Sequence, residues 1–522
     1  MRILILTILL TVLTGADADL HFPTKSHRTQ RRVTPASMVR RAGSHQYLSN
    51  RTEPFVVNGT NLPLYAHDLG ESYAGLLPIA QEYRVNPNGT DVRELFFWFF
   101  PSGNPAAAKE ITIWLTGGPG CSSLSAALQE NGPFLWQPGT AAPFPNPWAW
   151  NRLTNIVYIE QPVGVGFTQG TPGLLKSEAG VAQEFLGFWK NFVDTFELRG
   201  RKILVAGESY GGYFVPYIAD AMLNEKDMQL FNVDGTFIID PLIGSTSAGQ
   251  QVPLRAMTRK FPHLFPFNAT FEAQLAAVDT TCGFTAFLEE YLVYPPKSVQ
   301  PPAPSSSGTC NMFNALYTGI SFINPCFSPY HITDTCPYMA DPLTNPPDGI
   351  EYFNRSDVKA AINAPPVEWD ICRLGVFAGS VDESAPPNVD ILPRVIERLN
   401  KTLIVSGQLD LVLPTNGTLL AIQNMTWNGA LGFTSSPFTK QFFVPYVAAA
   451  TAGDAEGQLW PLAGTGIMGT MHAERGLTFV EVFLAGHQGP QFQPAAGFRQ
   501  LEWMLGRVES MSGTEDWTVE IN

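Results

Sequence analysis

The chain has 522 residues, of which 45% are hydrophobic and 12% aromatic, and its formal net charge is −14 at pH 7. This length suits one large enzyme domain with insertions, or two domains, and the apolar content argues against global disorder. The acidic balance disfavours nucleic acid as a partner and suits a soluble protein that works in mildly acidic surroundings. The alternative, that the negative charge only keeps the protein soluble, explains the composition equally well.

The first 48 residues have the pattern of a leader. Residues 1–18 combine a positive start, a short apolar run and an Ala-x-Ala end, which predict a signal peptide. Residues 19–48 are basic, and their paired arginines fit either a removable pro-segment or a disordered tail. No later run is apolar enough to span a bilayer, and the C-terminus does not resemble a lipid-anchor tail. We therefore expect a secreted protein without a membrane anchor, with the vacuole as an alternative destination.

Two further patterns agree with export. Six cysteines, an even number, are expected to form three bridges in an oxidising compartment. None of them has the short paired spacing of a zinc site, and we expect no metal and no cofactor. Eight Asn-x-Ser/Thr sequons are typical of exposed loops in a secretory protein. They begin at Asn50, Asn58, Asn88, Asn268, Asn354, Asn400, Asn416 and Asn424.

Short apolar runs that end at Gly or Pro alternate with helical patterns from about residue 50. The runs at 95–100, 111–115, 156–159 and 203–206 suit strands that are buried on both faces. Apolar positions at helical spacing predict a helix over 178–196. Strands that alternate with helices predict a mostly parallel sheet with helices on both sides.

This alternation breaks between about 245 and 395, where most of the cysteines and a Pro/Ser-rich stretch lie. We interpret residues 245–395 as a loop-rich cap that disulfides pin over the sheet. Strand-like runs at 402–405 and 479–484 are expected to rejoin the same sheet. The predicted organisation is therefore an α/β-hydrolase core made of residues 49–244 and 396–522, with the cap inserted between them.

The strongest motif is Gly-Glu-Ser-Tyr-Gly at 207–211, directly after the strand predicted at 203–206 and before a stretch that can be helical. A G-x-S-x-G sequence between a strand and a helix is the nucleophile elbow, in which a tight turn lifts the serine hydroxyl above the sheet. The helix N-terminus favours negative charge there. We predict that Ser209 is the nucleophile, in preference to a purely structural turn.

The fold requires the chain order Ser, acid, His. His487 lies in the loop after the strand-like run 479–484, which is where the fold places a general base. His472 lies in a polar segment, where packing within a loop is the expected role. Asp410 follows the run 402–405 and its turn, and it would hold and stabilise the imidazole of His487. Asp382 lacks this position at a strand end. A structural turn aspartate is the alternative role for Asp410.

An oxyanion hole needs backbone N–H groups close to the nucleophile. One is expected from Tyr210, the residue after the serine. The other is expected from the glycine-rich segment after the run 111–115, with Gly118 as the best candidate. A phosphate-binding loop is excluded, because no Gly-Lys-Ser/Thr ending follows.

Together these residues resemble the serine carboxypeptidase family. The resemblance covers residues from about 65 to 505, and the sequence around His487 looks closest to fungal members. The resemblance rests on several blocks in the family's order. The blocks are Trp-Leu-Thr-Gly-Gly-Pro-Gly-Cys-Ser-Ser at 114–123, Gly-Glu-Ser-Tyr-Gly-Gly at 207–212, the acid turn at 407–410 and Gly-His at 486–487, with Glu-Asn-Gly-Pro at 130–133, Asn151 and Gln-Pro-Val-Gly-Val-Gly-Phe at 161–167.

The resemblance implies release of single C-terminal residues from peptides and proteins, through an acyl-enzyme on Ser209. It also implies that Glu208, Glu130, Trp114 and Thr116 bind the free carboxylate of the substrate. Carboxyl groups that crowd a carboxylate cannot all be ionised, so we expect activity to be best at acidic pH. Thr116 stands where the family has Asn and offers one donor instead of two, and Gln488 stands where Met is common.

The family further implies a disulfide from Cys121 to Cys372. The remaining four cysteines are expected to pair within the cap, and we favour the nested arrangement Cys282–Cys336 and Cys310–Cys326 over sequential pairing. The sequence alone does not settle the connectivity.

Three other functions are compatible with the same scaffold: an esterase or lipase, an acyltransferase, and a relative that has lost activity. Glu208 argues against the first, because a hydrophobic acyl site gains nothing from an acid beside the nucleophile. Glu208 and Glu130 together favour hydrolysis of free C-termini over acyl transfer. The intact set Ser209, Asp410 and His487 argues against an inactive protein. The sequence does not indicate the oligomeric state.

Overall fold

The computed structural model describes residues 45–80, 92–346, 348–447 and 463–521. The signal peptide, nearly all of the basic segment and the sequon at Asn88 lie outside these residues. Within them, no helix is both long enough and apolar enough to cross a membrane.

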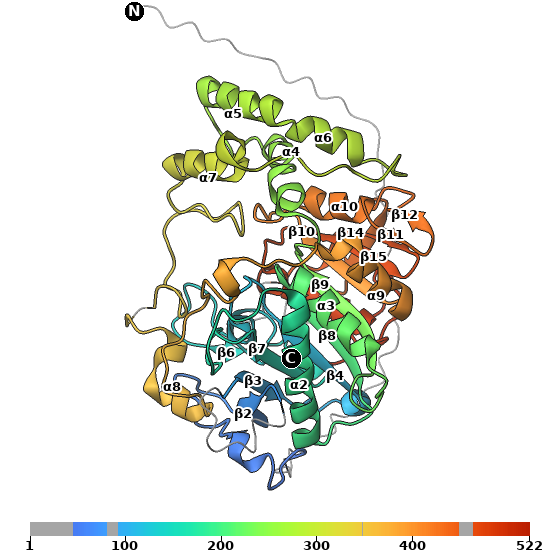
Figure 1. Cartoon of the computed structure of the whole chain (residues 1–522). Helices are drawn as coiled ribbons and strands as arrows, with labels where there is room; N and C mark the ends of the chain where they lie inside the picture. Colours follow the sequence, from blue (N-terminus) through green and yellow to red (C-terminus); the bar gives the residue numbers. More distant parts are fainter. Residues whose placement is uncertain (1–44, 81–91, 347, 448–462, 522) are drawn as a thin grey trace, which may run out of the picture. The chain divides into compact units, whose positions relative to one another are not determined.

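Eleven strands of the described chain form one sheet, in the order β1-β2-β3-β7-β4-β8-β9-β10-β15-β14-β13 (Figure 1). Their bounds are Val56–Val57 (β1), Ser72–Pro78 (β2), Glu94–Phe100 (β3), Ile156–Glu160 (β7), Glu110–Leu115 (β4), Lys202–Glu208 (β8), Val233–Ile239 (β9), Thr402–Gly407 (β10), Leu477–Val482 (β15), Gly466–Glu474 (β14) and Lys440–Val444 (β13). The strands expected from the sequence are all present, and the last begins and ends two residues earlier than expected.

The six central strands, from β7 to β15, pair in parallel, and the outer strands on both sides are antiparallel. The carboxyl ends of the parallel strands therefore meet at one edge, which is where an open α/β sheet carries its functional groups. Strands far apart in the sequence are neighbours, because β9 pairs with β10 across the whole insertion.

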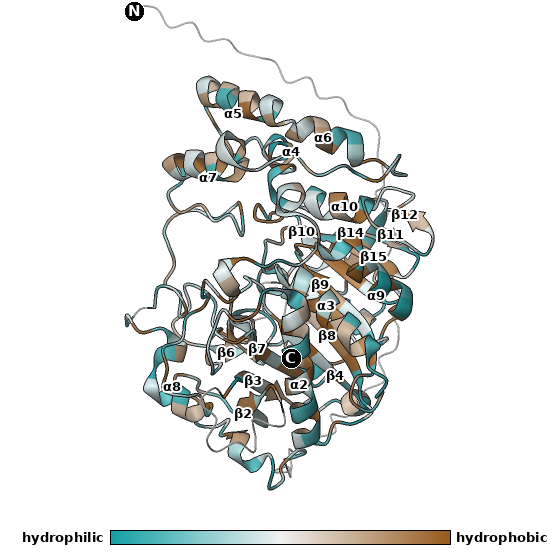
Figure 2. Cartoon of the chain, in the orientation of Figure 1, coloured by the Kyte–Doolittle hydropathy of each residue, from teal (hydrophilic) through white to brown (hydrophobic). Residues whose placement is uncertain are grey.

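Hydrophobic side chains cover both faces of the sheet, as the continuous apolar runs predicted. Phe97 and Phe99 of β3 belong to one core cluster, and Phe96 and Trp98 belong to the other. The helices of the first cluster are α2 (Glu178–Phe196), α3 (Gly211–Asn224), α9 (Ile391–Leu399) and α10 (Thr415–Gln423), and those of the second are α1 (Ser123–Gln129), α8 (Ser356–Ala361) and α13 (Pro494–Met504). Figure 2 shows central strands in hydrophobic brown and much of the visible side of α9 in hydrophilic teal.

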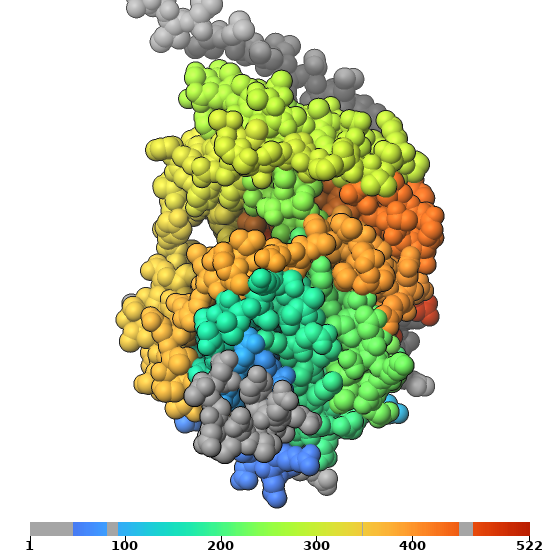
Figure 3. Space-filling view, viewed as in Figure 1, coloured from blue at the N-terminus to red at the C-terminus, as the bar shows by residue number. Residues whose placement is uncertain are grey.

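The segment expected to form the cap contributes a third core cluster of its own. It contains α4 (Leu254–Lys260), α5 (Ala269–Cys282), α6 (Phe284–Tyr291), α7 (Met312–Ile323) and α8 (Ser356–Ala361), of which the first four supply residues to the third cluster. That cluster also includes Leu409 and Leu411, which flank Asp410. Figure 3 shows a hollow between the yellow-green residues of this segment and the orange residues below it.

Three disulfides link the six cysteines. Cys121 is bonded to Cys372, as the family resemblance implied. The nested pairing within the cap is wrong, because the bonds join Cys282 to Cys310 and Cys326 to Cys336. Cys282 ends α5, and Cys310 lies in the short turn against which α5 packs. The Cys326–Cys336 bond closes a short loop, because the two cysteines are only 10 residues apart in the sequence.

Candidate active site

Ser209 sits in a tight turn between β8 and α3. Its φ of 59° lies in the left-handed region that non-glycine residues rarely adopt, which is the strained conformation of a nucleophile elbow. The backbone N–H of Ser209 donates to Ile239 O at 2.9 Å, and its carbonyl accepts from Leu242 N at 3.0 Å. A Cβ atom at Gly207 would lie 2.5 Å from Leu115 O, so glycine is required beside the turn. The turn is therefore fixed by both neighbouring strands.

His487 and Asp410 meet at the same edge of the sheet. His487 Nδ1 lies 2.7 Å from Asp410 Oδ2, and both side chains are buried. The other oxygen, Asp410 Oδ1, accepts from Val412 N at 2.7 Å and Leu413 N at 3.1 Å. Asp410 therefore cannot rotate away, and a proton on Nδ1 leaves Nε2 of His487 free to act as a base.

Two opposing effects determine the pKa of His487. Burial by itself lowers this pKa, but attraction to Asp410 and the hydrogen bond between them outweigh it and leave the pKa raised above its ordinary value. The imidazolium is thus stabilised at the position where a proton taken from the nucleophile would arrive.

The cap contacts the loops of both residues, which the sequence did not predict. Tyr330 O accepts from His487 N at 2.7 Å, and the Tyr330 ring packs edge-on against the imidazole with centroids 5.3 Å apart. Pro329 O accepts from Leu411 N at 2.9 Å, beside Asp410. This part of the cap lies in the loop that the Cys326–Cys336 disulfide closes. No motif marks Tyr330, because its role depends on a contact across the fold.

The glycine-rich loop after β4 lies directly against the elbow. A Cβ atom at Gly117 would be 2.4 Å from Tyr210 N, an approach that only glycine allows. Gly118 follows with a φ of 110°, again a conformation that favours glycine. The two backbone segments expected to supply oxyanion donors are therefore adjacent, at the N-terminus of the fourteen-residue helix α3.

Glu130 and Glu208 form a buried, hydrogen-bonded pair next to the nucleophile. Glu208 is the last residue of β8 and Glu130 caps the end of α1. Burial, together with the charge of Glu208, raises the pKa of Glu130 well above its ordinary range. Burial also raises the pKa of Glu208, although His487 and the bond from Glu130 oppose that shift. The pair therefore retains a proton at mildly acidic pH.

Trp114 and Thr116 lie at the end of β4 and are hydrogen-bonded to each other. Trp114 Nε1 donates to Thr116 Oγ1 at 3.0 Å, and Thr116 N donates to Ser123 Oγ at 3.1 Å. A hydroxyl that accepts one bond still has one proton to donate. Thr116 can therefore offer a ligand a single hydrogen bond.

Several buried polar atoms in this region have no partner within the described part of the protein. They include Oε2 of both Glu130 and Glu208, Nδ2 of Asn131 and Oδ1 of Asn151. Asn131 Oδ1 accepts from Tyr158 OH at 2.8 Å, so its amide is fixed with the NH₂ group unused. Unsatisfied buried groups are costly and call for a partner such as a ligand. The sequence analysis assigned no role to Asn131. Its position directly after Glu130 is the only feature of the sequence that could have indicated a place in the site.

His472 and Asp382, the alternatives to His487 and Asp410, have other partners. His472 lies on β14, where Nε2 is 3.1 Å from Glu474 Oε2. Asp382 accepts a short hydrogen bond from Tyr210 OH and two further bonds from Ser384.

The described sequons fall into two groups. Asn50, Asn58, Asn268 and Asn400 are exposed, whereas Asn354, Asn416 and Asn424 are half-buried. The side-chain amide of Asn354 donates to Glu351 Oε2 and Trp369 O, so that amide is used in packing. The exposed group is the better set of candidates for glycans. Within the described residues, no group of three or more His, Cys, Asp or Glu side chains could hold a metal ion.

The sheet order and the elbow at its carboxyl edge define an α/β-hydrolase. The family model described as serine carboxypeptidase matches residues 70–507. A probable serine carboxypeptidase from Arthroderma benhamiae is 47% identical over 89% of this chain and 88% of its own length. Serine-type carboxypeptidase F from Aspergillus niger is 44% identical over 90% of this chain and 89% of its own length.

A solved structure agrees at the level of the fold. A prohormone-processing carboxypeptidase from Saccharomyces cerevisiae matches with a TM-score of 0.68 at 20% identity, covering 88% of this chain and 97% of that chain. The chain therefore belongs to the serine carboxypeptidase family.

Proposed function

We propose that this serine-type carboxypeptidase releases single C-terminal residues from peptides and proteins through an acyl-enzyme on Ser209. The Ser209 hydroxyl attacks the last peptide carbonyl while Nε2 of His487 takes its proton. Asp410 holds the imidazole by its Nδ1 and stabilises the charged form. His487 then gives the proton to the departing amine, the peptide bond breaks, and the rest of the substrate stays on Ser209 as an ester. Water activated by His487 hydrolyses that ester.

The negative oxygen that forms during attack needs donors. We propose the backbone N–H groups of Gly118 and Tyr210, supported by the close approach of the Gly117 segment to Tyr210 N. Backbone donors that are fixed before the reaction need no reorganisation during it, which makes them effective in stabilising the transition state.

The buried pair Glu130–Glu208 carries the proposal of a free C-terminus as substrate. A protonated carboxyl can donate a hydrogen bond to the substrate carboxylate, whereas an ionised one would repel it. Thr116 and the free amide of Asn131 supply further donors, and Trp114 fixes the hydroxyl of Thr116. An acyl site for simple esters has no need of two buried acids, each with one oxygen that lacks a partner among the described residues.

We also propose that the protein is exported and glycosylated. Three disulfides suit an oxidising compartment, and four of the described sequons are exposed. Mass spectrometry of the protein from its native source, before and after enzymatic deglycosylation, tests this proposal. Absence of glycans from Asn50, Asn58, Asn268 and Asn400 would contradict it.

The test of the substrate class is a comparison of one N-blocked dipeptide with its C-terminal amide at pH 5. We expect cleavage of the free acid with release of one amino acid, and a kcat/KM lower by roughly 10-fold or more for the amide, because the carboxylate makes charge-assisted hydrogen bonds. Equal cleavage of both, or cleavage of simple esters only, would overturn the proposal.

A further inference from the structure

Asp240 is a buried acid that the mechanism does not use. It follows β9 directly, its side chain is 0% exposed, and its φ of 43° lies in the left-handed region. Aspartate tolerates this conformation better than most residues, but a strained non-glycine residue beside a site is a reason to look for a role. The segment around Asp240 holds the nucleophile, because Ile239 O and Leu242 N both bond the backbone of Ser209.

One carboxyl oxygen of Asp240 holds the turn that carries Asp410. Asp240 Oδ1 accepts a short hydrogen bond from Gly407 N. The carbonyl of Gly407 in turn accepts from Asp410 N at 3.4 Å. Gly407 therefore links Asp240 to the backbone of Asp410 through two hydrogen bonds.

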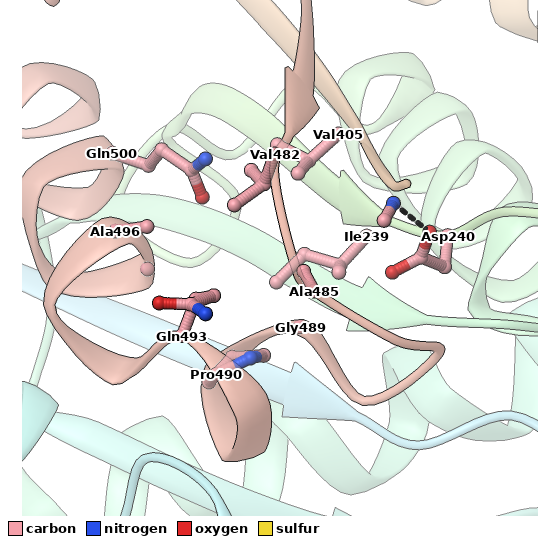
Figure 4. A pocket seen from close by; sticks show the side chains of 12 residues that line it. Ile239, Asp240, Val405, Val482, Ala485, Gly489, Pro490, Gln493, Ala496 and Gln500 are labelled. Carbon is pink, nitrogen blue, oxygen red and sulfur yellow. Dashed lines mark hydrogen bonds between the residues drawn. The ribbon is translucent and has the colours of Figure 1, made fainter. Parts of the chain in front are cut away.

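The other oxygen, Oδ2, faces the loop that carries His487. A Cβ atom at Gly489, two residues after His487, would lie 3.8 Å from Asp240 Oδ2. Oδ2 has no partner among the described residues. Figure 4 shows the bond from Asp240 to the backbone on one side and the segment from Ala485 to Pro490 on the other. Asp240 therefore stands between the loops of Asp410 and His487.

A small cavity lies beside these loops and is lined by Gly407 of one loop and by Ala485 and Gly489 of the other. Its volume is about 10 Å³, which is roughly the space of one water molecule. Its lining includes Ile239, Val405 and Val482, and the polar side chains of Gln493 and Gln500, but no lysine, arginine or histidine. The charged groups that act on Asp240 are Asp410 and Glu208, both acidic. A buried carboxyl without a cation, beside two other acids, is stable only in its neutral form.

We propose that Asp240 is a positioning residue for the triad: it acts as a neutral, proton-bearing group whose Oδ1 fixes the Gly407 turn and thereby Asp410. This inference rests on the proposed function of Asp410 and His487. A neutral group at this place adds no negative charge behind Asp410, so the charge that stabilises the imidazolium of His487 stays on Asp410 alone.

The proposal is tested with Asp240→Ala and Asp240→Asn in the full chain, with Asp234→Asn as a matched control. Asp234 lies near the start of the same strand and pairs with Lys202 and Lys401, away from the turn. Asparagine keeps an acceptor for Gly407 N and resembles a protonated aspartate, whereas alanine leaves that N–H unpaired. We expect Asp240→Ala to lower kcat about tenfold with KM nearly unchanged. Asp240→Asn and Asp234→Asn should retain kcat within about threefold.

The pH dependence of kcat/KM distinguishes a positioning role from a merely structural one, because a merely structural role would not shift it. Asp240→Asn should keep the acidic limb of kcat/KM where the wild type has it, because no charge is removed. If Asp240 were ionised, the same variant would shift that limb to lower pH by about one unit, and the proposal would be overturned. It would equally be overturned if Asp240→Ala kept the wild-type kcat, or if Asp240→Asn were as slow as Asp240→Ala. Should Asp240→Ala not fold, the Asp240→Asn profile decides.

Ser209→Ala separates this inference from the proposed function. If Ser209→Ala remains active, the proposed function fails. If Ser209→Ala is inactive while Asp240→Ala is as active as the wild type, only the positioning role of Asp240 fails.

Discussion

The ring of Tyr330 packs edge-on against the imidazole of His487, and its backbone carbonyl accepts the His487 N–H. Tyr330 belongs to the inserted segment and His487 to the loop after β15, so a contact across the fold supports the proposed general base. Replacing the Tyr330 side chain leaves its backbone bond to His487 intact if the loop stays in place. The ring contact is lost when the replacement has no aromatic ring. The insertion therefore contacts the proposed active site directly.

This contact predicts a modest loss of rate when the ring is removed. Tyr330→Ala should lower kcat about 2- to 10-fold, because an aromatic pair contributes about 0.5–1.5 kcal/mol. Tyr330→Phe is the matched control and should retain the rate, since it keeps the ring. Steady-state kinetics at one pH suffices, and equal rates for the alanine variant and the wild type would show that the ring does not support His487.

The disulfide between Cys326 and Cys336 should matter more for activity than the one between Cys282 and Cys310. The first closes the loop that contacts both His487 and Leu411, and the second joins the end of α5 to the short turn at Cys310, outside that loop. Replacing either pair by serine is expected to cost about 2–4 kcal/mol of stability, measured by denaturant unfolding. Only the Cys326/Cys336 replacement should lower kcat/KM at temperatures where both variants are folded.

The Glu130–Glu208 pair predicts that peptide cleavage falls as pH rises. Both carboxyl groups have raised pKa values, so the pair holds a proton at acidic pH, and as the pair loses protons at higher pH it comes to repel the substrate carboxylate. Glu208→Gln cannot ionise, and its kcat/KM should therefore stay flatter on the alkaline side. A C-terminal amide substrate should show little of this dependence in the wild type. A wild-type profile for peptides that is unchanged from about pH 4 to pH 8 would exclude the mechanism.

Thr116 provides a test of how the carboxylate is bound. Thr116→Val removes one donor to a charged group, which costs about 1.5–3 kcal/mol and should raise KM for a free-acid peptide by roughly 10- to 150-fold. Thr116→Asn offers a second donor and should lower KM below the wild-type value. Neither change should alter KM for the amide-capped peptide, and a parallel rise for both substrates would argue against contact with the carboxylate.

Glu160 predicts how stability depends on pH. Burial raises its pKa to about 7, although Ser122, Phe167 and Trp369 donate hydrogen bonds that oppose the shift. The folded state then binds more protons than the unfolded state between about pH 4.5 and pH 7, so stability falls as pH rises through that window. The loss should be up to about 3 kcal/mol for this group. Glu160→Gln should show a shallower fall of Tm between pH 5 and pH 7, and a slope identical to the wild type would contradict this account.

The sequence predicted what depends on local pattern. The apolar runs predicted the strands, and the elbow at 207–211 predicted Ser209 as the nucleophile. The rule that acid and histidine follow strand ends selected Asp410 and His487, which the structure brings to within 2.7 Å of each other. These features could be predicted because the periodicity of a strand and the geometry of a turn are encoded in adjacent residues.

Features that depend on contacts across the fold could not be predicted. The pairing within the cap follows from where Cys282 and Cys310 lie in space, and the nested arrangement that we favoured from the sequence is wrong, because the sequence does not settle the connectivity. Tyr330 and Asp240 carry no motif, because each acts on a partner far away in the chain. Their roles required knowing which loops meet at the carboxyl edge of the sheet.

The most direct measurement of the central claim is reaction of the protein with a serine-reactive organophosphate, followed by peptide mass spectrometry and a peptidase assay. The account predicts one label, on Ser209, with loss of activity in proportion to labelling, and a roughly 10⁴-fold or greater loss of kcat in Ser209→Ala. A label on another serine, or peptidase activity that survives full labelling of Ser209, would contradict it.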